Sequence, residues 1–220
     1  MRKPAVYMIE LRMRSSKTRI HDTNRYISRF FGVPVNKKPH VTLFGPFILK
    51  YGVKELDLLS HIARGVRNFD SVPVRIEGFD TREGVKGHVI AHRVDPGPDL
   101  LEMKKSLIGE LPRITRTNGM GDRDIANTWF HVTIAKKLSG EDAGKIWQTL
   151  SSDAVMESIP PEPGGSFFDG VVSRLREILI PNYNLAHIHP LRIHEDITRV
   201  SVLKGSKIFA EYDLEEKRWV

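Results

Sequence analysis

One short motif occurs twice in this chain of 220 residues, and its two copies strongly limit the possible folds. His-Val-Thr-Leu begins at His40 and His-Val-Thr-Ile begins at His131, each within an apolar, β-branched run. Such runs favour β-strands, in which residues two positions apart point to the same face of a sheet. Each copy therefore presents an imidazole and a hydroxyl side by side, about 7 Å apart along the strand. If the copies face each other, one site gathers both pairs.

These four side chains, His40, Thr42, His131 and Thr133, suit the cleavage of a phosphate ester without a metal. The ordinary pKa of histidine is about 6.5, so near neutral pH one imidazole can carry a proton while the other does not. In-line attack on phosphorus needs a base on the nucleophile side and an acid on the leaving-group side. The hydroxyls can donate hydrogen bonds to nonbridging oxygens. Which histidine would be the acid stays open at this point.

The periodicity of apolar residues predicts the order strand, helix, motif strand, helix in each half of the chain. The first half has these elements at 5–11, 15–31, 40–44 and 53–68, and the second half at 87–94, 98–111, 129–135 and 140–151. A further strand is expected at 72–79, a loop at 112–128, and a closing hairpin that turns at Lys204-Gly205-Ser206. A Pro/Gly-rich linker at 153–166 and a helix at 167–180 have no counterpart in either half, so 153–180 is a candidate insertion.

With its two motifs, their spacing and this order of elements, the chain resembles the two-histidine (2H) phosphoesterase superfamily. This is the group of the 2′-5′ RNA ligase-like proteins and the 2′,3′-cyclic nucleotide phosphodiesterases. The resemblance covers most of the chain and is weakest over residues 151–186. It implies one bilobal domain over 1–220 with an α+β fold, in which two pseudo-symmetric lobes, each an antiparallel sheet backed by helices, enclose a central groove. It also implies that His40 and His131 are catalytic, that Thr42 and Thr133 bind substrate, and that neither a metal nor a cofactor is needed.

The reaction that the resemblance implies is hydrolysis of a 2′,3′-cyclic phosphate on RNA or a nucleotide to a 2′-phosphomonoester. Two alternatives stay open, namely 2′-5′ RNA ligation and an RNA- or nucleotide-binding module with little turnover. The formal net charge of +7 favours an anionic partner, with RNA ahead of a membrane. Lys38 is predicted to steer substrate phosphates, and Phe44 to stack a base or line the groove, although packing in the core is the competing interpretation for Phe44.

Composition excludes several other classes of protein. The chain has no cysteine, which excludes disulfides, thiolate catalysis and cysteine-based zinc sites. No apolar run approaches the roughly 18 residues of a membrane span, and the N-terminus is interpreted as a strand and not as a signal peptide. We therefore expect a cytoplasmic monomer. His187, His189 and His194 are a candidate metal site, but Pro190 and the irregular spacing argue against it.

Overall fold

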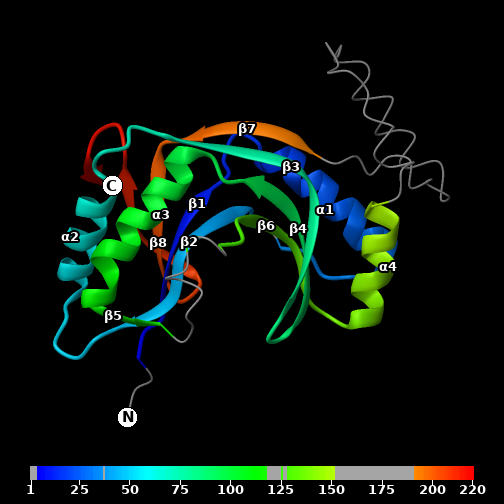
Figure 1. Ribbon diagram of the computed structural model, residues 1–220, viewed down its shortest axis with the longest axis horizontal. Helices are drawn as coiled ribbons and strands as arrows, with labels where there is room; N and C mark the ends of the chain where they lie inside the picture. The colour runs from blue at the N-terminus through cyan, green and yellow to red at the C-terminus, as the bar shows by residue number, and fades with distance from the viewer. Residues whose placement is uncertain (1–3, 37, 118–124, 126–127, 152–190) are drawn as a thin grey trace.

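The computed structural model describes residues 4–36, 38–117, 125, 128–151 and 191–220 (Figure 1). Its helices are α1 (Lys17–Phe31), α2 (Glu55–Val66), α3 (Pro98–Glu110), α4 (Gly140–Leu150) and a 3-10 turn at Leu111–Arg113. Its strands are β1 (Tyr7–Arg12), β2 (His40–Leu49), β3 (Val72–Gly84), β4 (Gly87–Asp95), β5 (Thr115–Thr117), β6 (His131–Leu138), β7 (Arg192–Ile197), β8 (Arg199–Lys204), β9 (Lys207–Asp213) and β10 (Arg218–Trp219).

The strands of the described residues form one sheet in the order β10-β9-β8-β1-β2-β6-β4-β3-β7, with β5 paired to β2. The pairings are antiparallel, which confirms the predicted α+β class with antiparallel sheet. The strand, helix, motif strand, helix order is confirmed in both halves, and so is the hairpin of β8 and β9. The two halves share this sheet, because the motif strands β2 and β6 lie next to each other and join them.

The helices pack on one face of this sheet. Along β6, Val132 belongs to the core cluster that α2 and α3 complete, whereas Ile134 belongs to the cluster that α1 and α4 complete. Residues two apart on a strand share a face, so both helix pairs cover the same side. Figure 1 shows the sheet strongly curved, with α2 and α3 at one end and α1 and α4 at the other. The side chains of β6 that lie between these positions point to the opposite face.

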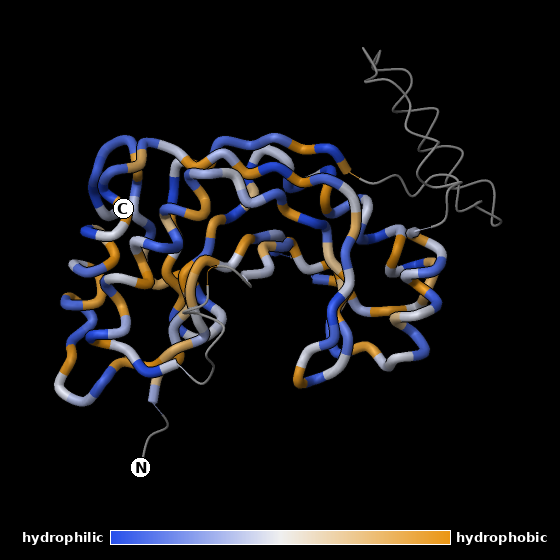
Figure 2. Tube along the Cα trace, viewed as in Figure 1, coloured by the Kyte–Doolittle hydropathy of each residue, from blue (hydrophilic) through white to orange (hydrophobic). Residues whose placement is uncertain are grey.

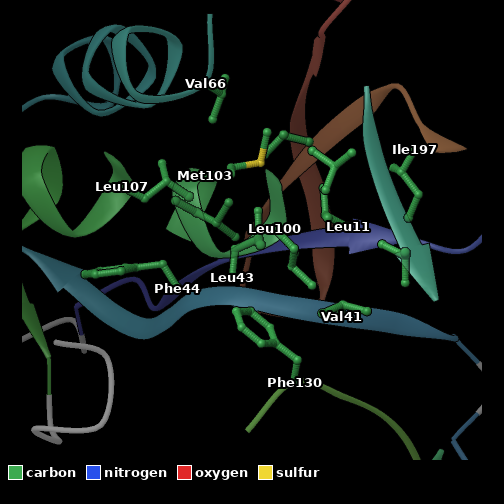
Figure 3. Close-up of a cluster of buried hydrophobic side chains, with 14 of the residues drawn as sticks. Leu11, Val41, Leu43, Phe44, Val66, Leu100, Met103, Leu107, Phe130 and Ile197 are labelled. Carbon is green, nitrogen blue, oxygen red and sulfur yellow. The ribbon is translucent and has the colours of Figure 1, made fainter. Parts of the chain in front are cut away.

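The larger core lies between β1, β2 and the helices α2 and α3 (Figure 3). Helical spacing places an apolar stripe of α3 against β2 and an apolar stripe of α2 against α3, and the buried members of these stripes are Leu58, Ile62, Leu100, Met103 and Leu107. Apolar and polar positions alternate in short stretches along the strands, as expected for a sheet with one covered face (Figure 2). Each such aliphatic side chain contributes about 1.5–3 kcal/mol by its burial, so this core holds the first motif strand rigidly.

Some of the predicted features fall outside the described residues, among them the candidate insertion at 153–180 and the two histidines His187 and His189. Three strands, β5, β7 and β10, were not predicted from the sequence, and β5 lies within 112–128, where a loop was expected. In the part of the chain that the structure describes, no helix combines the length and the apolar character needed to cross a membrane.

Candidate active site

A single register pair brings the two motifs together. Val41 of β2 lies opposite Val132 of β6, and both are fully buried on the helix-covered face. The residues on either side of each valine therefore point to the other face, and these are His40, Thr42, His131 and Thr133. The antiparallel register sets the histidine of each motif across from the threonine of the other, which leaves the two histidines as diagonal neighbours, with Cα atoms roughly 7–8 Å apart. All four side chains are only partly buried.

The two imidazoles are oriented in the same way. Nδ1 of His40 lies 2.7 Å from the carbonyl oxygen of Lys38, and Nδ1 of His131 lies 3.0 Å from that of Trp129. A carbonyl oxygen can only accept a hydrogen bond, so each Nδ1 carries the hydrogen. In a neutral ring the lone pair then lies on Nε2. The two halves of the chain thus repeat not only the motif but also the bond that selects the tautomer.

His131 has an apolar, stacked environment. The Trp129 ring lies against it, with centroids 3.9 Å apart and planes 18° apart. The guanidinium of Arg82 lies 5.2 Å from the centroid of the Trp129 ring, and the indole N–H donates to Asp80 at 2.6 Å. Burial lowers the pKa of His131, and the nearby charge of His40 lowers it further, against the opposite effect of the hydrogen bond to Trp129. His131 is therefore suited to accept a proton at Nε2 near neutral pH.

His40 has a different neighbour, a carboxylate. On β1, Glu10 pairs with Thr42 and Arg12 pairs with His40, so both β1 side chains share the face of the motifs. Oε2 of Glu10 lies 3.6 Å from Nε2 of His40, and Oε1 of Glu10 accepts a hydrogen bond of 2.6 Å from Nε of Arg12. The Glu10 side chain is only 1% exposed. The two imidazoles are thus alike in orientation but unlike in electrostatic environment.

An arginine stands beside His131 on the next strand. Arg93 of β4 pairs directly with His131 and is exposed. Its Nε donates to the carbonyl oxygen of Glu77 at 3.0 Å, which holds the guanidinium in place. Among the described residues no carboxylate lies within ion-pair distance of Arg93. Its positive charge is therefore not neutralised by any described carboxylate.

The other two predicted substrate-binding residues have different positions. The side chain of Lys38 is exposed, and its main-chain carbonyl is the group that orients His40. Phe44 is fully buried, with its ring 5.4 Å from that of Phe47 in the core. This burial does not agree with base stacking by Phe44. The pairing of β2 with β1 is irregular at this point, so the alternation of buried and exposed residues along β2 is interrupted. Leu43 and Phe44 are consecutive and both are buried.

Sequence reasoning missed Glu10, Arg12, Arg93 and Trp129. A signal existed for Trp129, which precedes His131 by two positions in the predicted strand 129–135 and would share its face there. The other three depend on which strands pair with β2 and β6, which no local pattern reveals. Within the described residues, no three His, Cys, Asp or Glu side chains are grouped in a way that could hold a metal ion.

Comparison with known proteins gives a family match and a similar fold. The model of the 2′-5′ RNA ligase superfamily matches residues 20–159, which include both motifs. No curated protein sequence matches significantly. Among solved structures, TT0787 of Thermus thermophilus has a TM-score of 0.53 at 12% identity, covering 96% of this chain and 98% of its own. Usb1 of Kluyveromyces marxianus, solved with uridine monophosphate, has a TM-score of 0.46 at 13% identity, covering 93% and 95%. The likeness to TT0787 shows a shared fold.

Proposed function

Because the chain belongs to the 2′-5′ RNA ligase superfamily, we propose that it hydrolyses 2′,3′-cyclic phosphates of RNA or nucleotides to 2′-phosphomonoesters. Membership of this superfamily supports a phosphoesterase or ligase-like activity in general. The observation that carries the specific proposal is the shared sheet face of two imidazoles and two hydroxyls, joined through the Val41–Val132 pair. The net charge of +7 agrees with an RNA or nucleotide substrate.

In the proposed reaction His131 is the general base. Burial lowers its pKa, so its Nε2 carries a lone pair near neutral pH and can take a proton from water. The water oxygen forms a bond to phosphorus as the bond to the ribose 3′ oxygen breaks. His40, on the opposite side of the phosphorus, donates a proton from Nε2 to that departing oxygen. The product keeps the phosphate on the 2′ oxygen, and each histidine has changed its protonation state once.

The other polar groups of this face would stabilise the charge that develops on the phosphate. Thr42 and Thr133 can each donate a hydrogen bond to a nonbridging oxygen. Arg93, the register partner of His131 on β4, would bring a further positive charge to the rim of this face. The ammonium of Lys38 is exposed next to His40 and would attract the phosphates of a longer RNA.

The test is hydrolysis of a 2′,3′-cyclic mononucleotide in the presence of EDTA, with the 2′-monophosphate followed by chromatography. We expect turnover that falls at least about 10²-fold in His40→Ala and in His131→Ala, since each variant loses a general acid or base. His194→Ala is the matched control, because His194 lies exposed on β7 and should leave the rate unchanged. Activity that persists in both motif variants would contradict the proposal, and activity abolished by EDTA would point to a metal.

Ligation of RNA ends is the second candidate, and the superfamily match is the observation that favours it. A ribose or 5′ hydroxyl in place of water would run the same proton transfers and form a phosphodiester. Incubation of an RNA bearing a 2′,3′-cyclic end with an RNA bearing a 5′ hydroxyl separates the two reactions. A longer product supports ligation, and an RNA of unchanged length with an opened terminal phosphate supports hydrolysis. Tight RNA binding with neither product would indicate a binding module.

A further inference from the structure

Glu10 is a buried carboxylate whose two oxygens have unequal partners. Oε1 accepts a hydrogen bond from Nε of Arg12 at 2.6 Å. Oε2 is shielded from solvent and has no hydrogen-bond partner among the described residues. A buried acceptor without a partner is costly, by about 1–3 kcal/mol and more when it is charged. The atom that faces Oε2 is Nε2 of His40, at 3.6 Å.

The hydrogen-bonding pattern of His40 decides whether this contact is favourable. Nδ1 donates to the carbonyl oxygen of Lys38, so a neutral His40 has its Nε2 lone pair toward the carboxylate of Glu10. Two acceptors then face each other, and the contact is repulsive. An imidazolium has a hydrogen on both nitrogens, and its Nε2–H can donate to Oε2 of Glu10. The arrangement around Glu10 is therefore complementary to the protonated ring alone.

From this geometry, and resting on the proposed function, we propose that Glu10 is a positioning residue that holds His40 as the general acid. Arg12 orients Glu10 through Oε1, and the negative charge at Oε2, 3.6 Å from Nε2 of His40, favours the protonated ring. When substrate is bound, that proton passes to the ribose 3′ oxygen, and Glu10 keeps its negative charge throughout. His131 differs, since its neighbours are the Trp129 ring and, beyond that ring, the guanidinium of Arg82. Glu10 thus makes two symmetry-related histidines chemically unequal.

The competing interpretation is that Glu10 merely balances the charge of Arg12 and stabilises the sheet. Glu211 offers a matched control for that role. It is also a poorly exposed carboxylate, on β9, and it accepts hydrogen bonds from Ser201 at 2.7 Å and from Arg14 at 2.8 and 2.9 Å. These partners do not include either motif histidine. A loss of charge and of packing at Glu211 therefore mimics the structural effect of the change at Glu10 without touching His40.

The experiment compares Glu10→Gln with Glu211→Gln through the pH dependence of kcat/KM for a 2′,3′-cyclic mononucleotide. The amide of Gln at position 10 can donate to Nε2, which favours the neutral ring. We expect the alkaline limb of the profile, where the general acid loses its proton, to move to lower pH in Glu10→Gln. The plateau rate should fall about 10-fold or more. Glu211→Gln should leave the limb in place. A limb that moves in neither variant, or equally in both, would overturn the role of Glu10.

A second measurement separates this inference from the proposed function and from a failure of the variant to fold. Nitrogen-15 NMR of the imidazoles reports directly whether Nε2 of His40 carries a hydrogen. At one and the same pH the wild-type protein should show a hydrogen on Nε2 of His40 and a lone pair on Nε2 of His131. If the protein shows no activity but this difference is present and is lost in Glu10→Gln, the proposed reaction is wrong and the Glu10–His40 pair is correct. Equal signals from both rings in the wild type would refute the pair.

Discussion

Protonation of His92 is expected to make the fold sensitive to mild acid. His92 of β4 is fully buried on the helix-covered face, and its Nε2 bonds to Oδ1 of Asn24 at 2.9 Å. Its Nδ1 is buried and has no partner among the described residues, so a proton there would place an unpaired charge in the core. Burial lowers the pKa of His92 to about 3. The unfolded chain, with an ordinary pKa near 6.5, binds this proton far more readily.

The sign and size of the effect follow from this difference. The folded pKa lies below the unfolded one, so the stability that neutral His92 preserves is fully present above about pH 6.5 and is lost as the pH falls toward 3. Each pH unit within this window costs about 1.4 kcal/mol. Between pH 7.5 and pH 5.0 the unfolded state takes up this proton over about 1.5 pH units below its pKa. The free energy of unfolding therefore falls by about 2 kcal/mol. For a chain of this length that is a fall in Tm of about 4–8 °C.

The assay is thermal or urea unfolding at pH 7.5 and pH 5.0 of the wild type and of the double variant Asn24→Leu/His92→Phe. The double variant removes the buried polar pair together, so that neither partner is left unsatisfied. Over this interval the free energy of unfolding of the wild type should fall by about 2 kcal/mol more than that of the double variant. Most carboxylates titrate below pH 5.0, so they contribute little to this difference. His194→Gln, which removes an exposed histidine, should behave like the wild type. An equal pH dependence in the wild type and the double variant would refute the reasoning.

Three further outcomes follow from the site and its supports. Arg93→Gln should lower kcat/KM about 10–100-fold and weaken its dependence on salt, because a charged hydrogen bond to phosphate contributes about 1.5–3 kcal/mol. Arg93→Lys should retain part of the activity. Unchanged steady-state kinetics in Arg93→Gln would exclude a contact between Arg93 and the phosphate. Trp129→Leu should admit water to His131 and so return the lowered pKa of His131 toward its usual value. The acidic limb of the kcat/KM profile should then move to higher pH, whereas Trp147→Leu should leave it in place. Glu195→Gln should destabilise the fold by about 3 kcal/mol in urea titrations, since this buried carboxylate accepts hydrogen bonds from three consecutive main-chain N–H groups at the start of α1. A loss below about 0.5 kcal/mol would show that those N–H groups find other partners.

Much of the secondary structure could be predicted because it depends on local periodicity. The apolar stripe of α2 and the Pro98 start of α3 are visible in the sequence, and the observed helices begin and end within two residues of their predicted bounds. The short strands β5 and β10 and the polar strand β7 were missed. β7 alternates buried and exposed residues over only six positions, and it is held by its pairing with β3, which no local pattern reveals.

By itself, the sequence determined that each motif presents a histidine and a threonine on one side of a strand, because alternation along a strand is a local property of the backbone. It also determined the chemistry that those residues can offer. Only the tertiary structure decided that Val41 meets Val132, and thereby that the two pairs share one face. It likewise decided that Glu10 lies beside one ring and Trp129 against the other, and that Phe44 is buried. These features depend on register and burial between distant segments, which are set by the packing of the whole core and not by any window of the sequence.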